Sequence, residues 1–433
     1  MESKIILPVS SFLDQKQKTV VYNISGSVVE FCPFEQSSSL LALGNKQGII
    51  LLKRTFFEID ELGDVSKLQF KERWGLKQIL YVQLGARVTS IAFSPTTYTD
   101  IVDVEKFSVT LAIAAEENNA WFLKSSSESK DPKLVTLGGT SGHQDFINDV
   151  DITYINITDD VDKMVFTGDI IATGGDDCTA IVWRITNDSP QISAYSTGSP
   201  VVSVKFHKFY PRRLLVGEYN KTIKVLDWAD AGGKWLIGLC LEHPLYTSVK
   251  SNLATCLVDV DWIGNKDDIG RIIAAVSNGS WFLWSFDGKN NNISAFPIVK
   301  GCIGSQANVK QIIFRPGHPD IFAICFQGFL KSSISHIKLI NVFVGMDPID
   351  IVLPLPETLK PEDSYISWHA NEGVIAICRN SSLMISFSLI RFLCKEYKCI
   401  LGIYNFCMRI VVRSIFLLGC HVFEPIPPFS ILR

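Results

Sequence analysis

Three side chains near the middle of the chain have the chemical types of a catalytic triad. His143 could serve as a general base, Thr173 as a hydroxyl nucleophile and Asp177 as the carboxylate that orients the histidine. Such a nucleophile must face a pocket that a substrate can enter. Thr173 instead lies inside the apolar stretch Asp169–Gly175 (DIIATGG), which is typical of a buried strand. The pattern therefore favours a structural role for these residues, with triad chemistry as the alternative.

The rest of the sequence offers little other chemistry. It contains no Cys-x-x-Cys pair, no His/Cys/Asp cluster with zinc spacing, no glycine-rich phosphate loop ending in Lys and Ser or Thr, and no Gly-x-Ser-x-Gly elbow. The seven histidines are dispersed. We therefore expect no catalytic residue, no metal, no cofactor and no small-molecule substrate, and we predict that the protein is not an enzyme.

A repeat of about 55 residues organises the chain. Each copy begins with alternating apolar residues that end in a large side chain, followed by a polar loop and two more short apolar stretches. The large residues of the seven copies are Phe31, Phe93, Ile152, Phe206, Trp262, Phe314 and Trp368. Their successive spacings are 62, 59, 54, 56, 52 and 54 residues. A repeat at this spacing indicates one supersecondary unit copied along the chain.

The apolar stretches of each copy predict short β-strands. Arg212–Glu218 and Thr222–Trp228, for example, are rich in β-branched and aromatic residues and are separated by a turn that contains Asn220. No stretch of the first 388 residues sustains a helical period. Each copy is therefore a small antiparallel sheet of about four strands. Seven such sheets can close radially, so we predict an all-β, seven-bladed β-propeller over residues 19–388.

A closed ring needs a partner for the open edge of its last sheet. Thr19–Tyr22 (TVVY) precedes the first copy, and Leu383–Phe387 ends the seventh. Pairing these two segments would join the ends of the propeller and cover an exposed strand edge. We therefore predict that they are neighbouring strands of one blade.

The third copy resembles a WD repeat. It contains Gly142-His143, then ATGGDD at Ala172–Asp177, and Trp183 six residues after Asp177. The resemblance implies that His143, Thr173, Asp177 and Trp183 form a buried, hydrogen-bonded tetrad that connects three strands. Four other copies keep a turn acceptor six residues before the position of the tryptophan, while most of the other tetrad members are lost. These acceptors are Glu116, Asn220, Asn278 and Asn380.

Several segments together resemble the nucleoporin thirty-seven family, small single-propeller subunits of the Y-shaped nuclear pore scaffold. They are VVEFCPFE (Val28–Glu35), GARVTSIAFSP (Gly85–Pro95), GHQDFIN (Gly142–Asn148) and GDDCTAIVWRI (Gly175–Ile185). The resemblance implies a scaffold subunit at the nuclear envelope, which in animals also visits kinetochores. It implies other Y-complex nucleoporins as partners, chiefly the long propeller-plus-helical subunit of the short arm.

A different class of propeller is the alternative, namely a peptide reader or substrate receptor such as a chromatin reader or ubiquitin-ligase adaptor. An aromatic cage or a basic ring in the central channel would favour that class, whereas an enzyme would need a cluster of acids with perturbed pKa values there. Residues 1–388 carry 35 basic and 42 acidic side chains. This negative balance disfavours direct nucleic-acid binding.

Both ends of the chain fall outside the repeat. Residues 1–18 form an N-terminal segment, and residues 389–433 form a basic tail in which 28 of 45 residues are hydrophobic. Cys399–Phe423 is long enough to span a bilayer, but Arg409 and Arg413 each cost roughly 2.5–3.5 kcal/mol there, so we expect no membrane insertion. The tail is interpreted as a non-native, mis-spliced terminus, with an extra packing element or a membrane anchor as alternatives.

Overall fold

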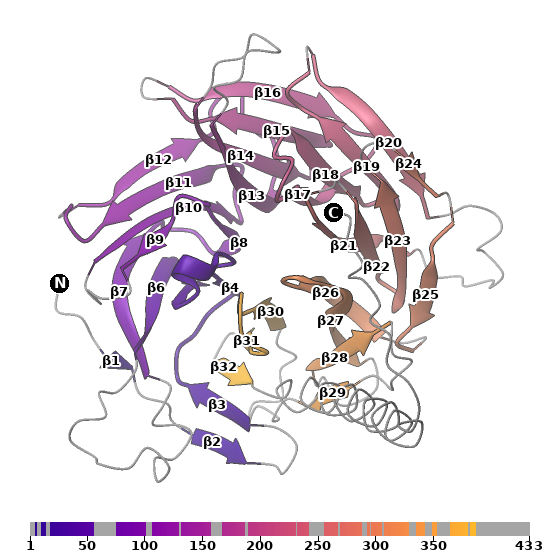
Figure 1. The fold of residues 1–433 in the computed structure, drawn as a ribbon. Helices are drawn as coiled ribbons and strands as arrows, with labels where there is room; N and C mark the ends of the chain where they lie inside the picture. Colours follow the sequence, from indigo (N-terminus) through magenta and orange to yellow (C-terminus); the bar gives the residue numbers. More distant parts are fainter. Residues whose placement is uncertain are drawn as a thin grey trace, which may run out of the picture. The chain divides into compact units, whose positions relative to one another are not determined.

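Seven antiparallel sheets surround one axis and form a closed ring (Figure 1). The computed structural model describes residues 5–6, 10–13, 18–55, 75–100, 106–129, 131–156, 167–186, 189–230, 232–241, 255–266, 269–287, 292–294, 296–304, 307–328, 335–342, 349–352, 364–379 and 382–386. The chain divides into two compact units, Met1–Phe387 and Ser388–Arg433. The second unit, which includes Cys399–Phe423, lies outside the described residues, as does Asn380.

Each sheet is one blade, numbered from the first repeat, and the strands of each repeat follow the chain outward from the axis. Strands from the N-terminal segment are added outside them in blades 1 and 7. Blade 1 contains β4 (Val28–Phe31), η1 (Glu35–Ser37), β5 (Leu40–Gly44), β6 (Gly48–Thr55), β7 (Gly75–Gln83) and β1 (Ile5–Ile6). Blade 2 contains β8 (Val88–Phe93), β9 (Tyr98–Thr99), β10 (Phe107–Ala115), β11 (Ala120–Ser126) and β12 (Lys133–Leu137). Blade 3 contains β13 (Ile147–Asn156), β14 (Thr167–Gly175), β15 (Thr179–Arg184) and β16 (Gln191–Ser196).

The other four blades complete the ring. Blade 4 contains β17 (Val201–Phe206), β18 (Arg213–Glu218), β19 (Thr222–Asp227) and β20 (Lys234–Cys240). Blade 5 contains β21 (Leu257–Gly264), β22 (Ile269–Val276), β23 (Ser280–Asp287), β24 (Asn292–Ile293) and β25 (Val299–Cys302). Blade 6 contains β26 (Ala307–Arg315), β27 (His318–Gly328), β28 (Ser335–Asn341) and β29 (Ile349–Val352). Blade 7 contains β30 (Ser364–Trp368), β31 (Ile375–Arg379), β32 (Leu383–Ser386), β3 (Lys18–Tyr22) and β2 (Ser10–Leu13).

The predicted all-β, seven-bladed propeller is therefore confirmed. No helix among the described residues is both long and apolar enough to cross a membrane. The large side chains that mark the repeat are all buried, with at most 8% of their surface exposed. Four of them end the innermost strand of their blade, whereas β13, β21 and β26 run on past Ile152, Trp262 and Phe314.

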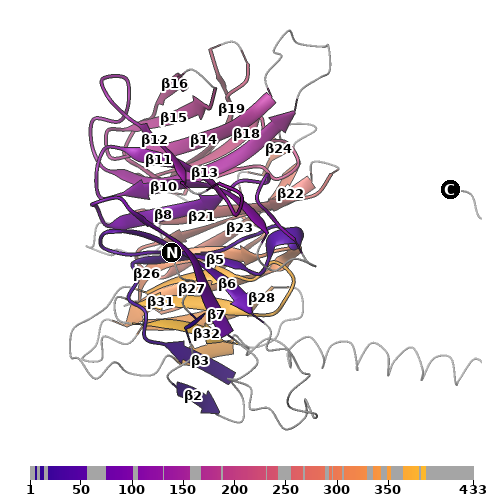
Figure 2. The ribbon, with the colours of Figure 1, turned by 90° about the vertical axis from the view of Figure 1, so that its left-hand side faces the viewer.

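The N-terminal strand closes the ring, as predicted. β3 pairs antiparallel with β32, with Thr19 opposite Ser386 and Tyr22 opposite Leu383. Figures 1 and 2 both place β3 beside β32, with β2 outside it. The short strands β1 and β2, from the segment 1–18, add outer edges to blades 1 and 7.

The hydrophobic core lies between neighbouring blades. Val28 and Leu51 of blade 1 pack in one cluster with Val88 and Ile113 of blade 2, and similar clusters join the blades that follow. Another cluster joins Tyr22 and Leu383 of blade 7 to Val29 of blade 1. Because these clusters lie between the faces of neighbouring sheets, packing the blades together removes apolar surface from water at each of these interfaces.

Candidate functional site

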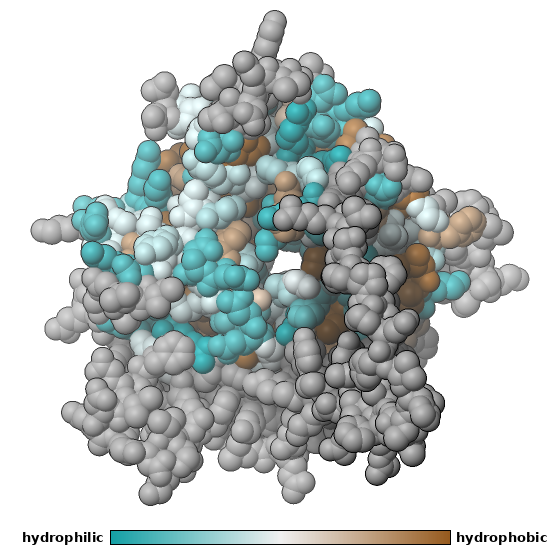
Figure 3. Space-filling view, in the orientation of Figure 1, coloured by the Kyte–Doolittle hydropathy of each residue, from teal (hydrophilic) through white to brown (hydrophobic). Residues whose placement is uncertain are grey.

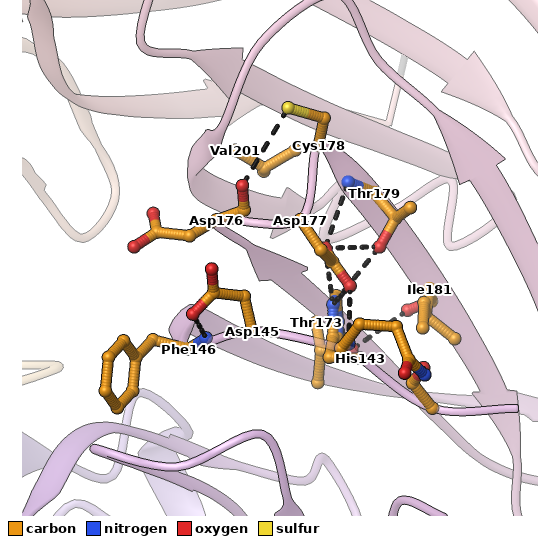
Figure 4. A network of polar contacts seen from close by, with 12 residues as sticks. His143, Asp145, Phe146, Thr173, Asp176, Asp177, Cys178, Thr179, Ile181 and Val201 are labelled. Carbon is orange, nitrogen blue, oxygen red and sulfur yellow. Dashed lines mark hydrogen bonds and ion pairs between the residues drawn. The ribbon is translucent and has the colours of Figure 1, made fainter. Parts of the chain in front are cut away.

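The structure brings the predicted tetrad together in blade 3, where His143, Thr173 and Asp177 meet (Figure 4). The Nε2 atom of His143 lies 2.8 Å from Thr173 Oγ1, and its Nδ1 atom lies 3.0 Å from Asp177 Oδ1. Trp183 Nε1 donates to Thr173 Oγ1 at 2.9 Å. One set of protons satisfies these three contacts: the indole donates to the threonine, the threonine to Nε2, and Nδ1 to the carboxylate.

Burial decides between the two interpretations of this group. His143 and Thr173 have no exposed surface, and Trp183 is 1% exposed. A nucleophile must reach a substrate. The Thr173 hydroxyl instead holds together the segment before β13, the strand β14 and the strand β15. Its geometry is that of a structural link between strands.

Two glycines allow this close packing. A Cβ atom on Gly175 would lie 2.6 Å from His143 Nδ1, and one on Gly174 would lie 2.4 Å from a methyl group of Val201 in blade 4. Any side chain at these positions would displace the histidine or the neighbouring blade. The TGG sequence after Ala172 is therefore explained by close approach of backbone and side chains.

The turn between β14 and β15 positions the carboxylate of the tetrad. Asp177 accepts hydrogen bonds from the Thr179 hydroxyl (2.6 Å) and from the backbone N–H of Gln144 (2.9 Å). Burial raises the pKa of Asp177, but these two bonds and the contact with His143 outweigh it and hold the pKa below its ordinary value. The next residue, Cys178, has a left-handed φ of 59°, which the tight turn requires.

Other blades keep the turn without the tetrad. Asn220 Oδ1 accepts from the N–H of Thr222, and Asn278 Oδ1 accepts from the N–H of Ser280, each at 3.0 Å. Both are Asx turns of the kind that Asp177 makes with Thr179. Glu116 differs, because its carboxylate contacts Arg87 at 2.6 Å. The predicted turn acceptors thus act locally in blades 4 and 5.

A second set of polar contacts links every pair of neighbouring blades along the innermost strands. These contacts join Ser27 Oγ to Val88 O, Ser90 Oγ to Asp149 Oδ1, Val204 N to Asp149 Oδ2, Ser203 Oγ to Val260 O, Ile312 N to Asp259 Oδ2, Ile366 N to Gln311 Oε1, and Phe31 N to Ser367 Oγ. Their lengths run from 2.6 to 3.2 Å. Together with the apolar clusters, they close the ring around its channel.

Two Asp-x-Asp pairs, Asp149 with Asp151 and Asp259 with Asp261, provide further links of this kind. Asp151 accepts from the N–H of Ile152 in its own strand and of Phe206 in the next blade. Asp261 accepts in the same way from Trp262 and Phe314. Our sequence analysis missed these residues. The signal was present, because Asp-Val-Asp occurs at the same repeat position in copies three and five.

The channel carboxylates surround Lys205. Its Nζ atom lies 3.0 Å from Asp149 Oδ2. Burial raises the pKa of Glu30 to about 8 and of Asp259 to about 7, with Lys205 lowering both. Burial likewise raises the pKa of Asp151 and of Asp261 to about 6. For Lys205, burial lowers the pKa, but the surrounding aspartates outweigh it and raise the pKa above its ordinary value.

Acidic residues with shifted pKa values in the channel are the feature that an enzyme would need. Their hydrogen bonds show what role these carboxylates have. Both carboxylate oxygens of Asp151, Asp259 and Asp261 accept backbone hydrogen bonds, one of them from the next blade. These groups therefore hold strands together. In the described part of the chain, no group of three or more His, Cys, Asp or Glu residues could hold a metal ion.

A cavity of about 900 Å³ fills the centre of the ring, and Figure 3 shows the opening. Asp149, Asp151 and Lys205 line its middle, and Phe146 and Asp176 line the end that carries the tetrad turn. Among the aromatic residues that line the opposite end, Phe34 is partly buried, and the others are almost fully buried between blades, namely Phe93, Phe206, Trp262, Phe314 and Trp368. The middle of the channel is therefore lined by acidic groups around Lys205, whereas a peptide-reading propeller is expected to carry a basic ring there.

The fold and the tetrad together define a seven-bladed WD-repeat β-propeller. No protein-family model matches the chain. The chain is 27% identical over 412 residues to an uncharacterized WD repeat-containing protein of Schizosaccharomyces pombe (strain 972). The alignment covers 86% of this chain and 97% of that protein, and its description agrees with the fold.

Proposed function

We propose that this protein is a non-enzymatic structural subunit of the Y-shaped, outer-ring scaffold of the nuclear pore. It acts there as a protein-interaction platform in pore assembly and nucleocytoplasmic transport. The observation that carries the proposal is the set of segments that resemble the nucleoporin thirty-seven family. Val28–Glu35 and Gly85–Pro95 contain the innermost strands of blades 1 and 2, and Gly142–Asn148 and Gly175–Ile185 contain His143, Asp177 and Trp183 of the blade 3 tetrad.

The closed ring suits a scaffold role on physical grounds. The tetrad residues and the channel aspartates Asp149, Asp151, Asp259 and Asp261 hold strands and blades together. The turns and the outer strands of the blades are therefore the surfaces available to bind a partner protein. A preorganised surface binds a partner protein with little loss of conformational entropy. The partners proposed are other Y-complex nucleoporins, chiefly the long propeller-plus-helical subunit of the short arm, at the nuclear envelope and in mitosis at kinetochores.

Affinity purification of the tagged full-length chain from native extracts tests this function. We expect the other Y-complex subunits to be recovered in stoichiometric amounts, and a fluorescent fusion to label the nuclear rim. A matched purification of an unrelated propeller with the same tag controls for nonspecific capture. Recovery of a ubiquitin ligase or chromatin proteins in place of the Y complex would overturn the proposal and favour a substrate-receptor or peptide-reading propeller.

A further inference from the structure

An exposed aromatic side chain stands at the channel end that carries the tetrad turn. Phe146 directly precedes β13, and 52% of its surface is exposed. Tyr219, on the corresponding end of blade 4, is equally exposed. Phe146 also lines the central cavity. A single exposed aromatic side chain is ordinary on a protein surface, so the groups around Phe146 decide whether it marks a contact surface.

Carboxylates border the ring on its own blade. Figure 4 shows the side chains of Asp145, Phe146 and Asp176 on the side turned away from His143 and Thr173. Hydrogen bonds fix this arrangement: Asp145 Oδ1 accepts from the N–H of Phe146 at 2.8 Å, and the carbonyl of Phe146 accepts from the N–H of Asp176 at 2.9 Å. Asn148 donates to Asp176 Oδ1 at 2.7 Å. The two carboxylates are thus held beside Phe146.

The neighbouring turn of blade 2 adds further negative charge. The carbonyl of Glu117 accepts from the N–H of Ile147, the residue after Phe146, at 3.2 Å. Glu116 and Glu117 are both exposed, and Glu116 also lines the cavity. Arg87 offsets one of these charges through its contact with Glu116. Four exposed carboxylates and one guanidinium therefore lie on the two adjoining turns of blades 2 and 3 near Phe146. We call Asp145, Phe146, Asp176, Glu116 and Glu117 the Phe146 surface.

We propose that the Phe146 surface docks a basic segment of a partner protein, with an arginine side chain over the Phe146 ring. A guanidinium stacks on an aromatic face through cation–π attraction and binds carboxylates in a planar, bidentate geometry. The charge of the surface selects a positive partner and repels nucleic-acid phosphates. The cavity behind Phe146 gives the segment room to extend toward the channel. The surface is independent of the pore assignment, since any partner with such a segment could use it.

Fluorescence anisotropy of the full-length chain with three labelled peptides tests this surface. The peptides share one sequence in which alternate residues are arginine, lysine or glutamate. We expect binding in the order arginine, lysine, glutamate, with binding of the arginine peptide weakened by added salt. Absence of arginine-peptide binding, or equal binding of the glutamate peptide, would overturn the proposal.

Variants locate the binding and exclude a general charge effect. Phe146→Ala should weaken binding of the arginine peptide by about tenfold, which lies between the values for an exposed and a desolvated cation–π contact. Asp145→Asn with Asp176→Asn should weaken it and reduce its salt dependence, while both asparagines can still accept the local backbone and side-chain bonds. Phe296→Ala removes an aromatic ring that is 53% exposed in blade 5 and should change nothing. Equal affinities for Phe146→Ala and Phe296→Ala would refute the site, provided that melting curves show both variants folded.

Discussion

At the scale of single residues, blades 3 and 5 differ in the hydrogen bond that the tetrad tryptophan makes. In blade 3 the indole of Trp183 donates to Thr173. In blade 5 the corresponding residue, Trp284, lies opposite Ile272, as Trp183 lies opposite Ile171. The position of Thr173 is therefore taken by Ala274, and the Trp284 Nε1 atom is buried without a hydrogen-bond partner.

Replacing the central hydroxyl should destabilise the fold. Thr173→Val leaves His143 Nε2 and Trp183 Nε1 buried without a partner, which costs about 1–3 kcal/mol of unfolding free energy. Urea unfolding followed by tryptophan fluorescence measures this change. Thr167→Val, at the exposed start of the same strand, is the control and should have little effect. Equal stability of the two variants would contradict the structural role of the tetrad.

Restoring the hydroxyl in blade 5 should have the opposite effect. Ala274→Ser places an acceptor at the tetrad position below Trp284, and satisfying the buried indole should add about 0.5–1.5 kcal/mol. The same unfolding measurement applies. If the serine variant is less stable than the natural chain, the missing acceptor for the Trp284 N–H is not what lowers the stability of this blade.

At the scale of secondary-structure elements, ring closure depends on a strand that is far from its partner in sequence. β3 completes blade 7 beside β32, and Tyr22 is fully buried between blades 7 and 1. The outer strand β1 contributes only a two-residue pairing with β7. We therefore expect β3 to contribute far more to stability than β1.

Truncation should reveal this difference. Deleting residues 1–24 removes β3 and exposes the edge of β32, so the melting temperature should fall sharply and the protein should aggregate more readily. Deleting residues 1–9 removes only β1 and should lower the melting temperature far less. Similar melting curves for the two truncations would contradict closure through β3.

At the scale of the whole molecule, the blades are joined by apolar clusters and by polar links around an acidic channel. Burial in this channel raises the pKa of Glu30 from its ordinary 4.5 to about 8. Between pH of about 4 and 8 the folded chain therefore binds protons that the unfolded chain does not. Glu30 therefore makes a contribution to the free energy of unfolding that falls as pH rises through this interval. His207 contributes the opposite slope below its ordinary pKa of 6.5, because burial lowers its pKa to about 4. Lys205 adds no opposing slope there, because it stays charged in both states.

Removing one of these carboxylates should flatten the pH profile. Glu30→Gln keeps the side-chain shape without a charge. Its melting temperature should match that of the natural chain near pH 5 and exceed it near pH 9, where the natural carboxylate is ionised. Melting curves across this range test the prediction. A constant difference at every pH would show that ionisation of Glu30 is not coupled to folding.

The sequence predicted the local features well and the contacts across blades poorly. Thr173 and Trp183 were identified because their motif falls within one repeat. Asp149, Asp151, Asp259 and Asp261 were missed, since their partners lie one repeat further along the chain. Phe146 was also missed, because an isolated phenylalanine before an apolar strand is equally compatible with a buried position.

The sequence by itself determined the number of blades, the short strands within each and the tetrad of blade 3, because alternation and turn residues act over a few neighbouring positions. Only the tertiary structure decided which carboxylates link the blades, why the pKa of Glu30 is raised and that Phe146 stays exposed among acids. Desolvation and exposure depend on surfaces that packing brings together from repeats 52 to 62 residues apart. No periodicity within a single repeat records them.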